Sequence, residues 1–370
     1  MRRYKTYING EWFEGTSGIV LRSVDPSNNQ ELGEIVQNSK EDVEYAIESA
    51  SRSFYKTREW RDLDVQQRSD KLLKIADMIE SEIDEIAKTE SMDNGKPLRE
   101  AQADVDDAVH CFRYYAGLIR TPSGQTYNVN SNFGNMHSYT LKEPVGVCAL
   151  ITPWNFPFLM SVWKIAPALA AGNSIIFKPS SETVLSALKL FEILDKCDLP
   201  KGTANLVIGS GSTVGNLLAE SKKVDMITFT GSTSVGQGIM RAAVGNVKKI
   251  GLELGGKSPN IVFADTDIDK TVEWVMMGIF LNQGEVCCAG SRLIIEKSIK
   301  DKFLKKLVER TDKLTLGAPL DNPDMGPLIS KKHMQDVLGY IEKGKAEGAK
   351  LLCGGYKCTD DDLVNGNFIK

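Results

Sequence analysis

Short apolar runs alternate with longer helical stretches over residues 146–245. The apolar runs, which predict strands, cover 147–151, 174–177, 204–208 and 226–229. The stretches between them, which predict helices, lie near 161–171, 183–197, 212–220 and 234–245. This order predicts a parallel, doubly wound α/β sheet with right-handed crossovers. Such sheets bind ligands beyond the carboxyl ends of their strands, so we expect the functional site there.

The first 120 residues carry a hairpin and a helical region. Asn9-Gly10 supplies the positive φ angles of a tight turn between two short strands. Apolar side chains then recur at steps of three and four along one helical stripe, at Ile75, Met78, Ile79, Ile83 and Ile86. Gly95-Lys96-Pro97 predicts the end of that helix, and a second helix is expected over 98–119.

Two further regions have patterns of their own. Residues 121–143 are rich in Gly, Asn and Ser and alternate near 137–141, which predicts a loop and an exposed hairpin. A second β-α set is expected after Gly256, with strands at 259–263 and 292–295 and a helix at 268–281. Residues 367–370 predict one more strand.

Composition excludes several classes of function. With 370 residues, 42% hydrophobic and 25% charged, the chain is an ordinary globular protein long enough for two domains. A net charge of −4 gives no reason to expect nucleic acid or an anionic membrane as a partner. No apolar run is long enough for a membrane span, and no secretory signal is expected. Seven cysteines without paired CxxC spacing favour reduced thiols in the cytoplasm.

The candidate catalytic residues include two cysteines in residues 280–292. Cys287 and Cys288 lie between two glycines in a polar stretch of sequence. A cysteine reacts as its thiolate, so it needs a suitable pKa and must stay accessible. Glu253, followed by Leu and two glycines, offers a carboxylate on a loop. The pair suggests a thioester made by a cysteine and hydrolysed with the glutamate as base. The alternative interpretation is two small buried cysteines.

Five motifs carry a family resemblance. They are Pro153-Trp-Asn-Phe-Pro157, Phe177-Lys-Pro179, Phe229-Thr-Gly-Ser232, Glu253-Leu-Gly-Gly256 and Asn282-Gln-Gly-Glu-Val-Cys287. With them the chain resembles, along its whole length, the aldehyde dehydrogenase superfamily of NAD(P)-dependent enzymes that oxidise aldehydes to acids. The resemblance implies a small-molecule aldehyde as substrate and NAD or NADP as cofactor.

The resemblance also implies how the chain is divided. Residues 1–124 and 144–254 would form a Rossmann-like NAD(P)-binding domain, and 255–370 a second α/β domain, the catalytic one. Residues 125–143 would form a β-ribbon that pairs with a neighbouring subunit in a homodimer or homotetramer, which would cover its exposed strands. Because the family continues beyond this point, we expect the catalytic domain to be truncated at Lys370.

The family nucleophile aligns with Cys287, and Cys288 is interpreted as a small neighbour that packs beneath it. Glu285 stands where the family usually has Gln. A carboxylate two positions from a thiol tends to raise the pKa of that thiol, so Glu285 would raise the pKa of Cys287. The alternative is a Glu285 side chain that points elsewhere.

Three more residues match catalytic positions of the family. The resemblance assigns oxyanion stabilisation to Asn155, together with the backbone N–H of Cys287, and water activation to Glu253. It assigns a proton relay to Lys164. The alternatives are a turn residue between prolines for Asn155, a solvated carboxylate for Glu253 and a surface lysine for Lys164.

The cofactor positions implied by the resemblance are Ile151, Trp154, Lys178, Ser181, Gly211, Gly215, Gly231, Ser232 and Leu254. Lys178 would bind the hydroxyls of the adenosine ribose. Ser232 begins a predicted helix, and free N–H groups at helix starts bind phosphate. Many NAD-preferring relatives carry Glu at the position of Ser181, so a hydroxyl there leaves room for a 2′-phosphate and predicts that NADP is accepted.

The substrate class is predicted from an acidic pair. Asp104 and Asp107 lie one helical turn apart, and we expect them on one face. They resemble the acidic element of betaine-aldehyde and aminoaldehyde dehydrogenases, which would attract a cation, and Trp163 matches an aromatic tunnel position. A solvated helix face is the alternative for the pair. No metal site is predicted, because Asp265-Thr-Asp-Ile-Asp269 lacks the Gly and Glu of a calcium loop.

Two functional hypotheses therefore stand. The first is an NAD(P)-dependent aldehyde dehydrogenase that releases a free carboxylic acid, with betaine aldehyde or an aminoaldehyde as the substrate, or else a neutral aliphatic aldehyde or a semialdehyde. The second is a non-catalytic dinucleotide-binding or interaction fragment.

Overall fold

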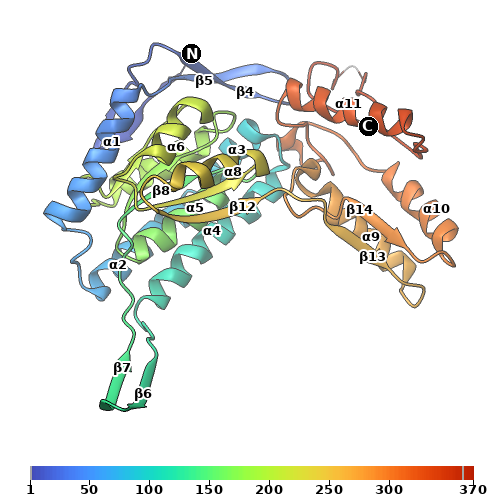
Figure 1. The fold of residues 1–370 in the computed structure, drawn as a ribbon. Helices are drawn as coiled ribbons and strands as arrows, with labels where there is room; N and C mark the ends of the chain where they lie inside the picture. The colour runs from blue at the N-terminus through green and yellow to red at the C-terminus, as the bar shows by residue number, and fades with distance from the viewer. Residues whose placement is uncertain (1, 361) are drawn as a thin grey trace.

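The computed structural model describes residues 2–360 and 362–370, and its centre is a seven-stranded sheet (Figure 1). The strands lie in the order β12 (Lys249–Leu254), β11 (Met226–Gly231), β8 (Val147–Ile151), β9 (Ser174–Lys178), β10 (Ala204–Leu206), β2 (Thr6–Ile8) and β3 (Glu11–Phe13). The first five are parallel, and β2 joins β10 in the antiparallel sense. The predicted parallel sheet is confirmed.

Helices cover both faces of this sheet. Along β8, Cys148 and Leu150 pack into one hydrophobic cluster, whereas Val147, Ala149 and Ile151 pack into another. The first cluster contains side chains of α2 (Val65–Ser81), α3 (Ile83–Asn94), α4 (Leu98–Leu118), α5 (Pro157–Ala170) and α6 (Leu185–Lys196). The second contains side chains of α1 (Lys40–Arg52), α7 (Asn216–Glu220) and α8 (Thr233–Ala243). Burial on both faces explains the continuous apolar runs of the parallel strands.

The N-terminal region contains the predicted hairpin and one correction. Asn9 and Gly10 join β2 to β3 with φ angles of 56° and 79°. A small separate sheet holds β1 (Arg3–Tyr4), β5 (Gln30–Val36) and β4 (Val20–Asp25). The apolar stripe that predicted one helix belongs to two, because the backbone leaves helical geometry at Glu82 (φ −112°, ψ 14°) between α2 and α3.

A two-stranded ribbon projects from the body of the molecule (Figure 1). It consists of β6 (Thr126–Ser131) and β7 (Gly134–Tyr139), paired antiparallel, and nearly all of its residues are exposed. The predicted exposed hairpin is confirmed. Its pairing with a neighbouring subunit stays a prediction.

The C-terminal region has a small core of its own. It contains β13 (Pro259–Val262), α9 (Ile268–Phe280), the 3₁₀ turn η3 (Leu281–Gly284), β14 (Arg292–Ile295), α10 (Lys300–Thr311), the 3₁₀ turn η4 (Pro319–Asp321) and α11 (Lys331–Ala346). β13 and β14 pair in parallel and pack with α9 and α10. The strand predicted at 367–370 is wrong, because Ile369 makes only an isolated bridge to Lys357.

The irregular turns lie beside regular helices. A π-helical turn, η1 (Ser53–Thr57), follows α1, and another, η2 (Gly211–Gly215), precedes α7. The predicted domain limit at 254–255 falls in the connection between β12 and β13, and it stays a prediction. Among the helices of the described residues, none combines the length and the apolar character that a membrane crossing requires.

Candidate active site

The segment that carries Cys287 leaves α9 through three consecutive left-handed residues. The φ angles of Asn282, Gln283 and Gly284 are 47°, 56° and 79°. Residues other than Gly adopt this conformation only when their surroundings fix it. The backbone N–H of Asn282 donates a hydrogen bond of 2.9 Å to Oε2 of Glu100, so α4 holds the start of the turn.

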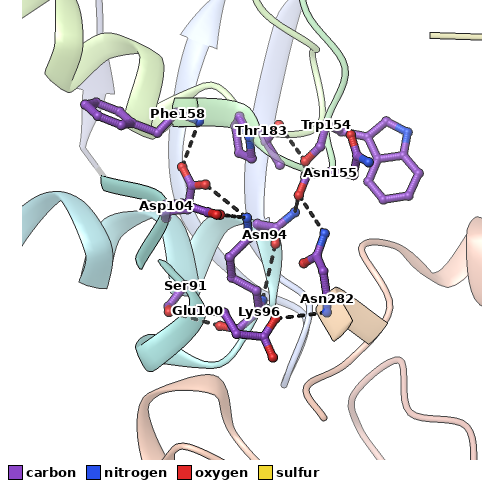
Figure 2. A network of polar contacts seen from close by, with 12 residues as sticks. Ser91, Asn94, Lys96, Glu100, Asp104, Trp154, Asn155, Phe158, Thr183 and Asn282 are labelled. Carbon is purple, nitrogen blue, oxygen red and sulfur yellow. Dashed lines mark hydrogen bonds and ion pairs between the residues drawn. The ribbon is translucent and has the colours of Figure 1, made fainter. Parts of the chain in front are cut away.

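Asn155, the predicted oxyanion residue, lies against this segment. Its Nδ2 donates to the backbone carbonyl of Glu285 at 2.7 Å, and its own carbonyl accepts from Nδ2 of Asn282 at 2.8 Å. Asn94, at the end of α3, donates to the carbonyl of Trp154 at 2.9 Å. Figure 2 shows Asn94 and Asn282 both reaching toward Trp154 and Asn155. These amides fix the loop before α5 and the cysteine segment relative to each other.

Cys287 and Cys288 are both exposed and free, so the interpretation as two buried cysteines is wrong. A Cβ added to Gly256 would lie 3.6 Å from the carbonyl oxygen of Cys287, which places the Gly-Gly motif beside the cysteine. Partial burial, followed by the neighbouring Cys288 thiol, raises the pKa of Cys287. The effect expected from Glu285 does not arise at neutral pH, because burial raises the pKa of that carboxyl to about 8.

Lys164 contacts β11, and Glu253 lies on β12, the neighbouring strand at one side of the sheet. Lys164, on α5, is buried, and its Nζ donates to Oγ1 of Thr228 on β11 at 2.9 Å. Burial lowers the pKa of Lys164 to about 8, and the charge of Glu253 partly opposes this shift. Glu253 is exposed near the end of β12. Lys164 is therefore not a surface lysine, and a pKa near neutrality suits proton transfer.

The predicted cofactor residues lie at the carboxyl edge of the sheet, where Ile151, Lys178, Gly231 and Leu254 end β8, β9, β11 and β12. Lys178 is buried, which lowers its pKa to about 8. Within the described residues, the one hydrogen bond of its Nζ goes to the carbonyl of Pro179 at 3.1 Å. A buried ammonium with so few partners fits a ligand that brings hydroxyl or phosphate oxygens.

The start of α8 is at the same edge. Ser232 caps this helix, and its hydroxyl accepts from the N–H of Val235 at 3.4 Å. A Cβ added to Gly231 would lie 2.4 Å from the ring of Phe229, so only glycine fits there. The free N–H groups and the positive potential of a helix start suit a pyrophosphate.

Of the remaining predicted cofactor residues, Gly215 lies beside Lys178. A Cβ added to Gly215 would be 3.9 Å from Cε of Lys178. The hydroxyl of Ser181 donates to the carbonyl of Gly209 at 2.9 Å, and Gly211 is exposed at the start of the turn η2. The lysine, the glycines and the helix start together fit an NAD(P) molecule laid across the edge of the sheet.

Asp104 and Asp107 do not form an open acidic pair. Oδ2 of Asp104 lies 2.5 Å from Nζ of Lys96, a fully buried ammonium (Figure 2). The same ammonium also pairs with Glu90 at 3.2 Å. The expectation of two solvent-accessible carboxylates on one helix face is wrong. Asp104 is buried, and its carboxylate forms an ion pair with Lys96. Asp107 and Trp163 are exposed, and their roles toward the substrate stay predictions.

The residues that hold these loops together were not predicted from the sequence. They are Asn94, Lys96, Glu100, Asn282 and His333, the last of which lies 3.5 Å from the carboxyl of Glu285. The helix end at Asn94-Gly95-Lys96 gave a local signal, since polar residues at such ends often bond to nearby backbone. Asn282 is the first residue of the motif that ends at Cys287. Glu100 and His333 have no local signal, because their partners are far away in the sequence.

Known proteins resemble this chain in sequence and in structure. Residues 12–370 match the aldehyde dehydrogenase family. The chain is 46% identical over 365 residues to betaine aldehyde dehydrogenase of Bacillus subtilis (strain 168), covering 98% of this chain and 74% of that protein. It is 43% identical over 368 residues to aminoaldehyde dehydrogenase 1, peroxisomal, of Pisum sativum, covering 98% and 73%. A crystal structure of betaine aldehyde dehydrogenase from Staphylococcus aureus in complex with NAD+ superposes with a TM-score of 0.95 at 41% identity, covering 99% of this chain and 72% of that one.

Proposed function

The chain belongs to the aldehyde dehydrogenase family, and on that premise we propose that it oxidises a cationic aldehyde, such as betaine aldehyde or an aminoaldehyde, to the free acid. Oxidation of an aldehyde with NAD(P)+ through a catalytic cysteine is the activity of the family, and the alternative of a non-catalytic module is set aside. The similarity to a betaine aldehyde dehydrogenase and to an aminoaldehyde dehydrogenase supports a cationic substrate.

One observation supports the assignment of the reacting residues more than any other. It is the 2.7 Å hydrogen bond from Nδ2 of Asn155 to the carbonyl of Glu285. This bond uses one N–H of the amide and holds the Asn155 side chain against the segment that carries Cys287, two residues further on. A preorganised donor at that place, with the backbone N–H of Cys287, stabilises a developing oxyanion.

The first half of the reaction takes place at Cys287. Its thiolate attacks the aldehyde carbon, a C–S bond forms, and the carbonyl oxygen becomes an oxyanion held by Asn155. The resulting thiohemiacetal becomes a thioester when the carbon gives up its hydrogen as hydride. NAD(P)+, when bound, supplies the hydride acceptor.

The second half releases the acid. Glu253 removes a proton from water, the hydroxide attacks the thioester carbon, and the Cys287 thiolate leaves. Lys164 passes protons between the site and its surroundings, which its pKa of about 8 favours. Lys178 and Ser181 hold the adenosine ribose, and the start of α8 at Ser232 holds the pyrophosphate.

Two further properties belong to this proposal. The exposed ribbon β6–β7 supports a homodimer or homotetramer, since exposed strands are usually covered in the assembled protein. The seven free cysteines support a cytoplasmic location, where thiols stay reduced.

The test is an absorbance assay of NAD(P)H formation by the purified protein. The panel contains betaine aldehyde, an aminoaldehyde, a neutral aliphatic aldehyde of similar length and a semialdehyde. We expect the highest kcat/KM for a cationic aldehyde. A higher value for the neutral aldehyde would favour a neutral substrate, which the neutralised Asp104 makes the second candidate. No NAD(P)H formation with any aldehyde would contradict the proposal.

A further inference from the structure

Asn282 is a fully buried residue in the turn that follows α9, and its backbone is left-handed, with φ 47° and ψ 45°. Its backbone carbonyl accepts from the N–H of Glu285 at 2.8 Å, and its Nδ2 donates to the carbonyl of Glu285 at 3.4 Å. Its backbone N–H donates to Oε2 of Glu100 at 2.9 Å. Asn282 therefore closes the turn before Cys287 and fastens that turn to α4.

Two hydrogen bonds join this turn to the loop before α5. Nδ2 of Asn282 donates to the backbone carbonyl of Asn155 at 2.8 Å, and Nδ2 of Asn155 donates in return to the carbonyl of Glu285 at 2.7 Å. Figure 2 shows the side chain of Asn282 directed toward Asn155. One hydrogen bond would let the two segments rotate about it. Two bonds that run in opposite directions fix the orientation of the segments as well as their separation.

The neighbouring carbonyls determine which end of the Asn282 amide faces them. A carbonyl oxygen accepts and cannot donate, so the NH₂ end must lie on the side of Asn155 and Glu285. Oδ1 then lies on the other side, where it is buried and meets no donor within residues 2–360 and 362–370. An unpaired buried oxygen and a left-handed backbone each cost free energy, and costs of this kind are typical of functional sites.

Asn94 does not replace Asn282 in this arrangement. Nδ2 of Asn94 donates to the carbonyl of Trp154 at 2.9 Å and lies 3.5 Å from the carbonyl of Asn155. Because Asn94 comes from the end of α3, it holds the loop but not the segment that carries Cys287. Within the described residues, only the amides of Asn155 and Asn282 form hydrogen bonds between that loop and that segment.

We infer that Asn282 is a positioning residue for the oxidation: by donating to the carbonyls of Asn155 and Glu285, it holds the Asn155 amide at the segment of Cys287. The inference rests on the proposed roles of Asn155 and Cys287. A donor that is displaced from its place stabilises an oxyanion less well. Asn282 acts through Asn155 and not on the aldehyde, so its removal should matter only while the Asn155 amide is present.

The experiment follows acylation of the protein by p-nitrophenyl acetate, which needs no cofactor. The Cys287 thiolate attacks the ester carbon, an oxyanion forms, the C–O bond breaks, p-nitrophenolate leaves and an acetyl thioester remains. The burst of p-nitrophenolate gives the acylation rate constant and the half-saturating ester concentration. Cys287→Ala gives the background from the other thiols.

Asn282→Gly removes the amide and keeps the left-handed backbone accessible. We expect its acylation rate constant to fall about tenfold to a hundredfold, with the half-saturating ester concentration unchanged. Asn282→Asp keeps the size of the side chain and also tolerates this backbone. It turns an acceptor toward two carbonyls, so it should be slower still. A parent-like rate in Asn282→Gly would overturn the inference.

A double-mutant cycle separates positioning from a general structural effect. Asn155→Ala should slow acylation by about a hundredfold to a thousandfold. Adding Asn282→Gly to Asn155→Ala should change the rate by less than about twofold, because the amide that Asn282 positions is already gone. If Asn282→Gly slows both backgrounds by the same factor, or if Asn155→Ala acylates like the parent, the inference is wrong.

Asn246→Gly is the matched control. Nδ2 of Asn246 also donates to two backbone carbonyls, those of Lys222 and Val224, at 3.1 Å and 3.0 Å, but it does so just before β11, at the amino ends of the strands. Its loss should leave acylation unchanged, and a loss of rate like that of Asn282→Gly would count against positioning. Failure of the proposed function shows separately, as the absence of NAD(P)H with every aldehyde. A parent without a burst above Cys287→Ala would overturn the inference itself.

Discussion

The Nζ atom of Lys96 lies 2.5 Å from Oδ2 of Asp104 in a site almost closed to solvent. Glu90 pairs with the same ammonium, and its other oxygen accepts from the backbone N–H of Phe158 at 3.0 Å. The ammonium also lies 4.3 Å from the ring centroid of Phe156, a cation–π distance. One buried cation therefore ties α3 and α4 to the start of α5, directly after the loop that carries Asn155.

The first prediction concerns the stability of this buried group. Asp104→Asn removes a charge partner of Lys96, and breaking a buried ion pair costs about 3 kcal/mol. The free energy of unfolding, measured in urea, should fall by that amount. Asp107→Asn, one turn further along α4 and exposed, is the matched control and should change it by less than about 0.5 kcal/mol. Equal values for the two variants would show that Asp104 is not a structural partner of Lys96.

The second prediction concerns the nucleophile. Cys287→Ala should abolish NAD(P)H formation, because no thiolate is left to attack the aldehyde. Cys288→Ala removes the adjacent thiol, which raises the pKa of Cys287, and should leave most of the activity. Both are measured as kcat/KM on the best aldehyde. Activity without Cys287, or equal losses from the two changes, would contradict the assignment.

Much of the fold follows from local sequence. β8 and β9 were predictable because strands buried on both faces read as apolar runs, and the hairpin at Asn9-Gly10 because its turn requires positive φ angles. The break at Glu82 was not predictable, since the apolar stripe continues through it. The false strand at 367–370 shows the same limit: a strand needs a partner, and here Ile369 finds only a single bridge.

The candidate site also has features that the sequence predicted and features that it did not. The positions of Cys287, Asn155 and Glu253 were predicted from motifs. The ion pair between Asp104 and Lys96 was not predicted. The helical spacing of Asp104 and Asp107 does not indicate which of the two side chains contacts Lys96. His333 contacts Glu285 across 48 positions of sequence, 333 minus 285, and only the packing of α11 brings them together. Hydrophobic periodicity does not predict which charged residues pair when they lie far apart in the sequence.

The third prediction concerns hydrolysis of the thioester. Glu253→Gln keeps the size of the side chain but cannot accept a proton from water. The variant should acylate normally and show a burst of reduced cofactor of up to one equivalent per site, followed by slow turnover. Stopped-flow absorbance resolves the two phases. If steady-state turnover at neutral pH matches the parent, Glu253 is not the general base.

The fourth prediction concerns cofactor preference. Ser181→Glu places a carboxylate near Lys178, where the 2′-phosphate of NADP is proposed to lie. Like charges at that distance in a partly dry site cost on the order of 1–4 kcal/mol, so kcat/KM for NADP should fall much more than for NAD. Ser181→Gln, of similar size but neutral, is the control and should shift the ratio less. The parent should accept both cofactors. An unchanged NADP/NAD ratio in Ser181→Glu would mean that residue 181 does not face the ribose.

The last prediction concerns the charge of the aldehyde. Since Asp104 is neutralised by Lys96, the exposed Asp107 is left to attract a cation from this face of α4. An exposed carboxylate contributes up to about 1 kcal/mol, so Asp107→Asn should lower kcat/KM for betaine aldehyde or an aminoaldehyde about threefold to fivefold. A neutral aldehyde of similar length should be almost unaffected, and added salt should shrink the difference.

Asp106→Asn is the matched control for this last change. Asp106 is also exposed on α4, but it lies 3.6 Å from His110. If both variants lower kcat/KM for the cationic aldehyde alike, the effect is that of general surface charge and Asp107 has no special role. If Asp107→Asn affects cationic and neutral aldehydes equally, the acidic residue is a solvated position on the helix. Selectivity for the cation would then have to come from another surface, such as the exposed ring of Trp163 on α5, which can attract a cation through its π face.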